Sequence, residues 1–579
     1  MRHFCLAVCF ATCCASALAQ EALGRVDGVQ AVLPEVDKYY ADLAAKEHLP
    51  GVVYGVLLDG KLVHTRALGY ANVEEKIPVT VDTQFRIASM TKSLVSMAAL
   101  KLRDQGKLRL DDPVANYLPE TRKLALPTSD SPVLTVRMLM TMMTGLPEDN
   151  PWGDRQMALS NLEIEKLVGA GLSFSNAPGV GFEYSNLGYL MLGKVVSKAS
   201  NMRFQDYITQ HILLPLGMTS TTWEYTKVAP SRLALGYQWI NNGWQREPML
   251  SDGGGAALGG LITSLTDFSR YVALLMDGGP ARDGTETGPI KRASLREMQQ
   301  AHVFAGFASQ AKLVDNVTPN PLAISYGYGL NVVHAANGTV MVGHSGGLPG
   351  FGSNYMLAPE HRVAVIAFGN LRYAPMSTAR PIGLLIERGK LAARDIPATP
   401  ILLARQQQVG QLIQTWDEKL GQEIAADNLF LDRSREDWIK LSQDKLGPIG
   451  KVSSIGAIKA SNRLRGTFPV VGERGTLSVN FTLTPEANPK VQAIRFLPQS
   501  PAALPAGTPV VVQVREGLYS ILGKNVATPA EVLELIKQNN ATAIRLSPGA
   551  SDDYERIGKL IYAAQRAGII LQIDPPAAK

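Results

Sequence analysis

The sequence predicts an α/β domain, residues 26–393, followed by two small α+β domains. Alternating apolar and polar residues, typical of strands, lie near both ends of the first domain, at 52–67 and 352–370. Helical periodicity dominates the stretch between them. Two linker-like stretches, 394–399 and the Pro- and Ala-rich 498–509, separate the remaining domains. This order indicates one sheet to which both ends of the first domain contribute strands.

The elements of the first domain follow from local patterns. An amphipathic helix is expected at 29–46, and then a β-hairpin at 52–67 that turns at Asp59-Gly60. A second strand pair surrounds the turn Pro359-Glu360-His361, and a helix near 376–390 closes the domain. Three further helices are expected to begin near Ser89, Phe204 and Leu265.

The rest of the chain predicts two smaller domains. A helix at 406–425 and alternating strands within 467–496 indicate an α+β domain at 400–498. The last domain, 509–575, has a β-α-β-α-β pattern. Its strands are expected at 510–514, 543–546 and 569–573; its first helix opens with the capping box Thr528-Pro529-Ala530-Glu531, and its second runs from a Ser551 cap to Gly568. This last pattern resembles the periplasmic domain of ExbD/TolR-type proteins, and we expect a docking or dimerisation role for it.

The N-terminus has the features of a secretory signal peptide at 1–19. A short basic start precedes an apolar stretch at 4–17, and Ala17-Leu18-Ala19 offers a small-residue cleavage site. We therefore expect a periplasmic or secreted protein. The four cysteines all fall in this segment: Cys5, Cys9, Cys13 and Cys14. The mature chain is thus expected to lack disulfides, a thiolate metal site and a cysteine nucleophile.

Composition excludes several other classes of function. Hydrophobic residues make up 46% and charged residues 19% of the chain, which is typical of a globular protein. The net charge of +6 is not gathered into a Lys/Arg block, so no nucleic-acid partner is expected. No apolar run after the signal reaches the roughly 18 residues of a membrane span. The histidines show no metal-ligand spacing, so we expect neither a metal nor a cofactor.

Three short motifs carry candidate chemistry. In Ser89-Met90-Thr91-Lys92, residues three apart share a helix face, so the lysine can reach the serine hydroxyl at a helix N-terminus. A partly buried lysine can accept that proton. In Tyr184-Ser185-Asn186, the phenol can relay a proton and the amide can hold a substrate carbonyl. His344-Ser345-Gly346-Gly347 lies just before a strand expected at 354–357, where a strand edge can bind extended substrate.

Each motif alone has an ordinary structural explanation. The occurrence of all three, in this order and within one domain, is not explained in that way. Together they resemble the serine β-lactamase/DD-peptidase superfamily, in particular the group related to class C β-lactamases. That family has a Ser-x-x-Lys, a Tyr-x-Asn and a Lys/His-x-Gly motif. The resemblance implies a β-lactamase/transpeptidase-like fold, with an antiparallel sheet formed by both ends of the domain plus a helical region. It covers roughly 360 residues.

The resemblance also implies a role for each matching residue. Ser89 would be the nucleophile, and Lys92 and Tyr184 would move its proton, with either of them open as the general base. Asn186 would contact the acyl side chain. The oxyanion hole would use the backbone N–H groups of Ser89 and Gly347. The substrate would run along His344, Ser345 and Gly346.

Two departures from the family pattern bear on the substrate. His344 stands where class C β-lactamases have lysine, which removes most of a positive charge that would meet a substrate carboxylate. Met142 stands where many members have histidine. We therefore expect an amide or ester hydrolase acting on D-amino-acid peptides or β-lactams. The alternatives are a promiscuous carboxylesterase and a non-catalytic peptidoglycan- or penicillin-binding sensor.

Overall fold

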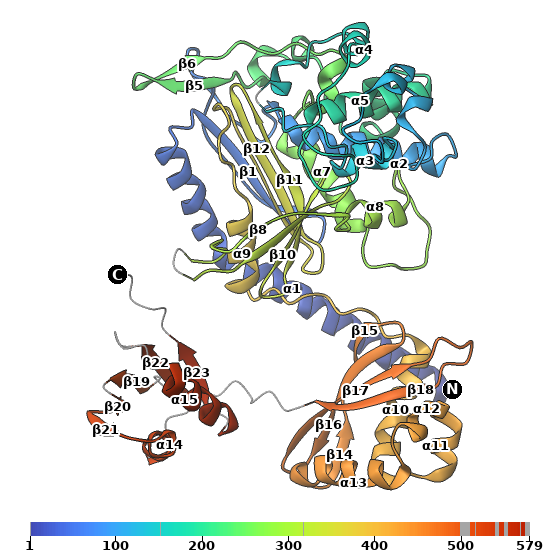
Figure 1. Cartoon of the computed structure of the whole chain (residues 1–579), viewed down its shortest axis with the longest axis vertical. Coiled ribbons are helices and arrows are strands. Elements are labelled where there is room, and N and C mark those ends of the chain that lie inside the picture. Colours follow the sequence, from blue (N-terminus) through green and yellow to red (C-terminus); the bar gives the residue numbers. More distant parts are fainter. Residues whose placement is uncertain are drawn as a thin grey trace. The chain divides into compact units, whose positions relative to one another are not determined.

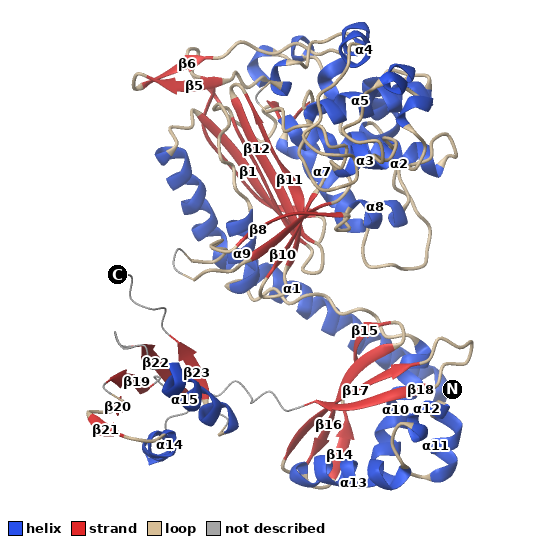
Figure 2. Ribbon diagram, viewed as in Figure 1, coloured by secondary structure: helices blue, strands red, loops and turns tan. Residues whose placement is uncertain are grey.

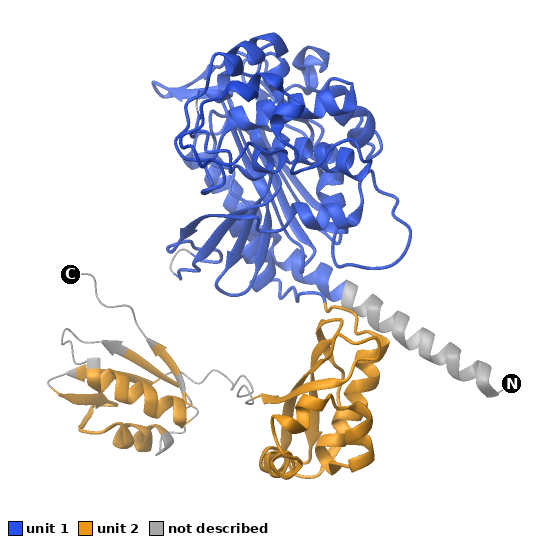
Figure 3. Cartoon of the chain, turned by 45° about the vertical axis from the view of Figure 1, so that its right-hand side comes forward, with its two compact units in different colours: residues 1–394 blue, residues 395–579 orange. Residues whose placement is uncertain are grey.

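The computed structural model describes residues 2–150, 152–315, 318–497, 510–515, 517–538, 543–548, 554–567 and 569–573. The chain divides into two units, Met1–Arg394 and Asp395–Lys579 (Figure 3). The first unit contains all three motifs, and each unit is described by itself.

A nine-stranded antiparallel sheet forms the centre of the first unit (Figure 2). Its order is β3-β2-β1-β13-β12-β11-β10-β9-β8. The strands are β1 (Gly51–Leu58), β2 (Lys61–Asn72), β3 (Ile77–Pro78), β8 (Val303–Ala308), β9 (Leu322–Tyr326), β10 (Asn331–Ala335), β11 (Val340–Leu348), β12 (Phe351–Ala358) and β13 (Val363–Gly369). Because β1 pairs with β13, the predicted sheet built from both ends of the domain is confirmed.

Helices cover both faces of this sheet (Figure 1). On one face lie the C-terminal part of α1 (Arg2–Lys46) and α9 (Ala379–Glu387), which contact each other. On the other face lies a larger group of helices that includes α2 (Thr91–Asp104), α5 (Asn186–Ser200) and α7 (Leu265–Asp277). Every residue of β13 is therefore buried, and its side chains alternate between two hydrophobic clusters, one on each face.

The remaining elements of the first unit are short. They are α3 (Val136–Thr141), α4 (Asn161–Gly169), α6 (Phe204–Ile208), α8 (Arg292–Met298), β4 (Phe85–Arg86), β5 (Tyr237–Ile240), β6 (Gly243–Arg246) and β7 (Ile262–Thr263). The predicted hairpin is confirmed, and its turn residues Asp59 and Gly60 both have positive φ, as a tight hairpin requires. Strands β8, β9 and β10 were not predicted, because each is short and none has a regular alternation of apolar and polar residues; β8, for example, reads VFAGFA.

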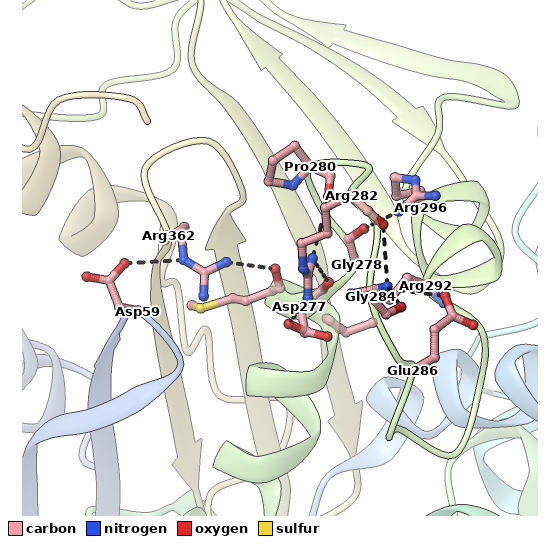
Figure 4. A network of polar contacts seen from close by, with 12 residues as sticks. Asp59, Asp277, Gly278, Pro280, Arg282, Gly284, Glu286, Arg292, Arg296 and Arg362 are labelled. Atoms are coloured by element: carbon pink, nitrogen blue, oxygen red, sulfur yellow. Dashed lines mark hydrogen bonds and ion pairs between the residues drawn. The ribbon is translucent and has the colours of Figure 1, made fainter. Parts of the chain in front are cut away.

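Guanidinium groups bind the C-terminal end of α7 (Figure 4). Arg362 donates to the carbonyl of Met276 at 3.2 Å and to Asp59 Oδ1 at 3.2 Å, so it joins the helix to the β1–β2 turn. Arg282 donates to Asp277 and Arg296 donates to Gly278. Cations are favourable at the negative end of a helix dipole, and the two contacts of Arg362 join α7 to the sheet.

The second unit begins with helices and a five-stranded sheet. The helices are α10 (Pro400–Thr415), α11 (Glu418–Ile424), α12 (Asp427–Leu431) and α13 (Arg435–Leu446); the strands are β14 (Val452–Ile455), β15 (Lys459–Asn462), β16 (Arg465–Gly472), β17 (Gly475–Leu483) and β18 (Val491–Leu497).

The prediction of one helix at 406–425 is wrong. The chain turns at Trp416, whose φ is 49°, and Asp417 caps α11. Trp416 is buried and stacks on Trp438, so packing outweighs the helical pattern.

The last part of the second unit forms another sheet, of order β21-β20-β19-β22-β23. Its elements are β19 (Val510–Arg515), β20 (Leu518–Ile521), β21 (Lys524–Val526), α14 (Pro529–Gln538), β22 (Ala543–Pro548), α15 (Tyr554–Arg566) and β23 (Ile570–Ile573). The β-α-β-α-β order is present, with strands β20 and β21 as an unpredicted addition. The capping box is confirmed: Thr528 N donates to Glu531 Oε2 at 2.9 Å, and Glu531 N donates to Thr528 Oγ1 at 3.3 Å.

Three predictions fall outside the described residues: the linker at 498–509, the Ser551 cap and the helix end at Gly568. The likeness to ExbD/TolR-type domains stays a prediction.

Candidate active site

Ser89 lies in a 3₁₀ turn, Ala88–Met90, that leads directly into α2. Its side chain is close to that of Lys92, one helical turn later, and Lys92 Nζ is 2.9 Å from Ser89 Oγ. Ala88, directly before the serine, has a φ of 51°, a left-handed conformation that costs energy in a residue other than glycine. The predicted nucleophile and its lysine are thus in hydrogen-bond contact, on a sharp turn.

Lys92 is wholly buried, with three acceptors around its amino group. Nζ lies 2.9 Å from Ser89 Oγ, 2.7 Å from Asn186 Oδ1 and 2.6 Å from the Leu258 carbonyl oxygen. Burial lowers the pKa of Lys92 from 10.5 to about 7, although the carboxylates of Asp154 and Asp149 oppose that change. Near neutral pH this lysine exists in both protonation states, as a group that exchanges a proton with a serine must.

Tyr184 lies over the same amino group, and its hydroxyl hydrogen-bonds Ser89. Lys92 Nζ is 5.0 Å from the centre of the Tyr184 ring. Burial raises the pKa of Tyr184 well above its ordinary value, and the hydrogen bond with Ser89 opposes this only in part. The phenol therefore stays protonated in the resting site, next to both Ser89 and Lys92.

Asn186 is the first residue of α5, and its side chain points to Lys92 rather than capping the helix. Ser185 is the cap, and its Oγ accepts from Gly188 N at 3.2 Å. The carboxylate of Asp149 accepts from the backbone N–H groups of Asn186 and Leu187, each at 2.7 Å. A helix N-terminus offers free N–H groups to such a carboxylate, so the start of α5 is held from outside the helix.

The His344 motif lies within β11, not ahead of a strand as the sequence suggested. His344 is buried, and its Nε2 is 3.0 Å from the Tyr326 hydroxyl. Burial, together with the nearby Lys92 charge, lowers the pKa of His344 to about 3. The imidazole is therefore neutral, which removes the positive charge that a lysine would supply here. Ser345 is exposed on the next position of the strand.

One edge of β11 is free of strand pairing beside Ser89. Its pairing with β12 continues to Leu348, whereas its pairing with β10 ends at Gly343. Gly346 faces the nucleophile segment: a Cβ there would be 2.3 Å from the Ile87 carbonyl oxygen. The glycine is thus needed for packing of β11 against the turn that carries Ser89, rather than only for approach of a substrate.

A sequence model of the Beta-lactamase family matches residues 36–387, which is more than half of the chain. The chain belongs to the Beta-lactamase family. Relatives agree with this membership. Protein flp of Staphylococcus aureus (strain MW2) is 27% identical over 341 residues, 57% of this chain and 62% of that protein. Penicillin-binding protein 4* of Bacillus subtilis (strain 168) is 27% identical over 321 residues, 54% of this chain and 66% of that protein. The chain therefore spans less than two thirds of these relatives' own length.

A solved structure shares the fold of this family member. The octameric penicillin-binding protein homologue from Pyrococcus abyssi superposes with a TM-score of 0.51 at 21% identity, over 79% of this chain and 93% of that one. At this identity the likeness shows the fold alone. The covered share exceeds the length of the first unit, so the likeness extends into the second.

The structure adds residues to the family site that the motifs did not reveal. They reach the motif residues from other parts of the chain: Asp149, Asp154, Leu258, Tyr326 and Tyr373. Leu258 contributes only its carbonyl, which no side-chain pattern can indicate. The stretch 145–154, rich in Gly, Pro, Asp and Asn between two helices, was the one available signal, because functional loops often have this composition.

Among the described residues, no group of three or more His, Cys, Asp or Glu side chains is arranged to hold a metal ion. Within the same described part of this family member, no helix combines the length and the apolar character needed to cross a bilayer.

Proposed function

We propose that the chain is an exported serine hydrolase that forms an acyl-enzyme on Ser89 and cleaves amide or ester bonds. The 2.9 Å contact between Lys92 Nζ and Ser89 Oγ, in a site that lowers the pKa of Lys92 to about 7, supports this proposal most strongly. Membership of the Beta-lactamase family agrees with it. The apolar segment 1–19 supports export as a signal peptide.

We infer that Lys92 is the general base and Tyr184 the proton relay. About half of the Lys92 amines are unprotonated at pH 7, whereas the Tyr184 pKa is far above neutrality. The neutral amine takes the proton from Ser89 Oγ while Oγ bonds to the acyl carbon, and the carbonyl electron pair moves onto oxygen. The predicted oxyanion hole, formed by the N–H groups of Ser89 and Gly347, stabilises that charge.

Collapse of this intermediate breaks the bond to the amine or alcohol. The leaving group takes the proton from Lys92 through the Tyr184 hydroxyl. Water then attacks the ester on Ser89 by the same route, which releases the acid and restores the serine. This sequence uses only side chains and backbone of the chain itself.

A D-amino-acid peptide or a related β-lactam is the first substrate class, because Penicillin-binding protein 4* is among the relatives. A neutral His344 favours a carboxylesterase as the second, since nothing at that position offers a charge to a substrate carboxylate. The second unit adds two further sheets, for which we propose docking or self-association. The octameric state named for the Pyrococcus abyssi homologue is consistent with self-association.

Covalent labelling tests the proposal. The mature chain is incubated with a fluorescent penicillin and with p-nitrophenyl acetate, and the adduct is located by mass spectrometry of the intact protein and its peptides. Ser89→Ala should lose the adduct and the turnover while it keeps the thermal unfolding midpoint of the wild type. Labelling that persists in Ser89→Ala contradicts Ser89 as nucleophile. Labelling without turnover of esters, β-lactams or D-Ala-D-Ala peptides would favour the non-catalytic sensor.

A further inference from the structure

We propose that Tyr373 and Asp154 form a bridge on the acyl side of the site, which makes esters with short acyl chains better substrates than esters with long ones. This inference rests on the proposed function, because it names the substrate class of the same site. The two side chains together are the Tyr373–Asp154 bridge.

Tyr373 lies against the end of β11 where a substrate would pair. Its backbone N–H donates to the Leu348 carbonyl oxygen at 3.3 Å. A Cβ on Gly347 would be 2.8 Å from Tyr373 Cδ1, so the ring rests on the residue whose N–H is predicted to line the oxyanion hole. Tyr373 also has a φ of 51°, an unfavourable conformation for a tyrosine that its contacts must hold in place. The aromatic ring is therefore a fixed part of the site wall.

Asp154 holds the other end of the bridge, beside Asn186. It lies in the 3₁₀ turn Gly153–Arg155, and a Cβ on Gly153 would be 2.6 Å from the Asn186 Cβ. Asp154 is 2% exposed, and its Oδ2 accepts a hydrogen bond from the Tyr373 hydroxyl at 3.2 Å. Asn186 is the residue assigned to the acyl side chain. The bridge therefore runs from the substrate strand to the acyl side of the site.

Protonation states favour a closed bridge at neutral pH. Burial raises the pKa of Tyr373 to about 12, so its hydroxyl keeps the proton that it donates. Burial raises the pKa of Asp154, and the Lys92 charge and the hydrogen bond from Tyr373 oppose that rise only in part. A hydrogen bond to a carboxylate is stronger than one between neutral groups.

The Tyr373–Asp154 bridge limits the length of the acyl chain because Ser89 is little exposed. Ser89 is only 8% exposed. Because the Tyr373 ring lies against Gly347 and its hydroxyl bonds Asp154, whose neighbour Gly153 packs on Asn186, we infer that an acyl chain directed toward Asn186 meets this ring. A methyl group is small enough to avoid the ring. A longer chain has to displace the ring and break the contact with Asp154. Each additional carbon should therefore lower the catalytic efficiency.

The experiment compares p-nitrophenyl acetate, butyrate and hexanoate on the full mature chain. The readout is the ratio of kcat/KM for hexanoate to kcat/KM for acetate. Tyr373→Ala should raise this ratio about tenfold or more, the usual effect of a few methylene groups in a pocket. Tyr373→Phe keeps the ring but loses the bond to Asp154, and it should raise the ratio about threefold. Tyr70→Ala is the matched control, because Tyr70 is equally exposed (40%) on β2, and its ratio should match the wild type.

The outcomes separate this inference from the proposed function. An unchanged ratio in both Tyr373 variants, with Ser89-dependent turnover of acetate intact, overturns the bridge and leaves the hydrolase in place. If the wild type shows no Ser89-dependent turnover of any ester and no penicillin adduct, both are overturned. Thermal unfolding of each variant is measured alongside; if Tyr373→Ala fails to fold, the ratio in Tyr373→Phe alone decides.

Discussion

Asn186→Leu should move the acid limb of the pH–rate profile to lower pH. Asn186 Oδ1 accepts from Lys92 Nζ at 2.7 Å, and it is one of three acceptors around a wholly buried amine. Leucine has a similar size but accepts no hydrogen bond, so the substitution removes a contact that favours the charged amine. In the proposed mechanism the catalytic form of Lys92 is the neutral one, so activity should rise with pH as the proton leaves. A lower pKa therefore shifts that rise downward.

The size of the shift follows from the strength of one hydrogen bond. A hydrogen bond to a charged group contributes about 1.5–3 kcal/mol. One pKa unit corresponds to about 1.4 kcal/mol. The pKa of Lys92 should thus fall from about 7 by about one to two units. In the wild type the neutral fraction at pH 7 is about half, whereas a lysine with a pKa of 10.5 would be neutral in about one molecule in 3,000.

The assay is kcat/KM for p-nitrophenyl acetate between about pH 5 and pH 9, followed at the isosbestic wavelength of p-nitrophenol. Asn186 is also predicted to hold the substrate, so the plateau should fall as well, and the midpoint of the acid limb is the readout. Asn428→Leu in the second unit is the control, with a midpoint near that of the wild type. A midpoint that stays at about pH 7 or rises in Asn186→Leu refutes the role of Asn186 in tuning Lys92.

Three further substitutions test the site. Lys92→Met should abolish turnover. Its stability relative to the wild type should increase as the pH falls from about 10 to about 7, because the folded state of the wild type disfavours the charged lysine by up to about 5 kcal/mol. Urea unfolding across that pH range measures the difference in stability. Gly346→Ala should lower the free energy of unfolding by about 1–3 kcal/mol and remove most of the activity, because the new Cβ would meet the backbone just before Ser89. Gly558→Ala is the control: the space around Gly558 is open, so this variant should not be destabilised. Tyr326→Phe leaves a nitrogen of the buried His344 without its partner and should cost about 1–3 kcal/mol in thermal unfolding.

Each of these has an outcome that would contradict it. A Lys92→Met variant whose stability advantage is the same at pH 7 and pH 10 would mean that burial does not depress the lysine pKa. A fully stable and active Gly346→Ala variant would mean that β11 can move away from the nucleophile segment without cost. An unchanged unfolding midpoint in Tyr326→Phe would mean that His344 finds another partner.

The three motifs could be found from the sequence because local geometry determines much of what they do. Ser89 and Lys92 share a face of one helix, so their 2.9 Å contact follows almost from the spacing alone. The β1–β2 turn was equally readable, since Asp59-Gly60 favours the positive φ values of a tight hairpin. In contrast, a continuous helix was predicted at 406–425, whereas the chain turns at Trp416, where the indole stacks on Trp438 and Asp417 caps the next helix.

The sequence by itself determined which residues are the candidates for the chemistry: Ser89, Lys92, Tyr184 and Asn186 in the first unit. Only the tertiary structure decided their chemical state. The pKa of Lys92 near 7 and the neutrality of His344 both result from burial among groups that lie far away in the chain. The Tyr373–Asp154 bridge likewise joins residues 219 positions apart. Desolvation and contacts of this kind depend on packing in three dimensions, and no local pattern encodes them.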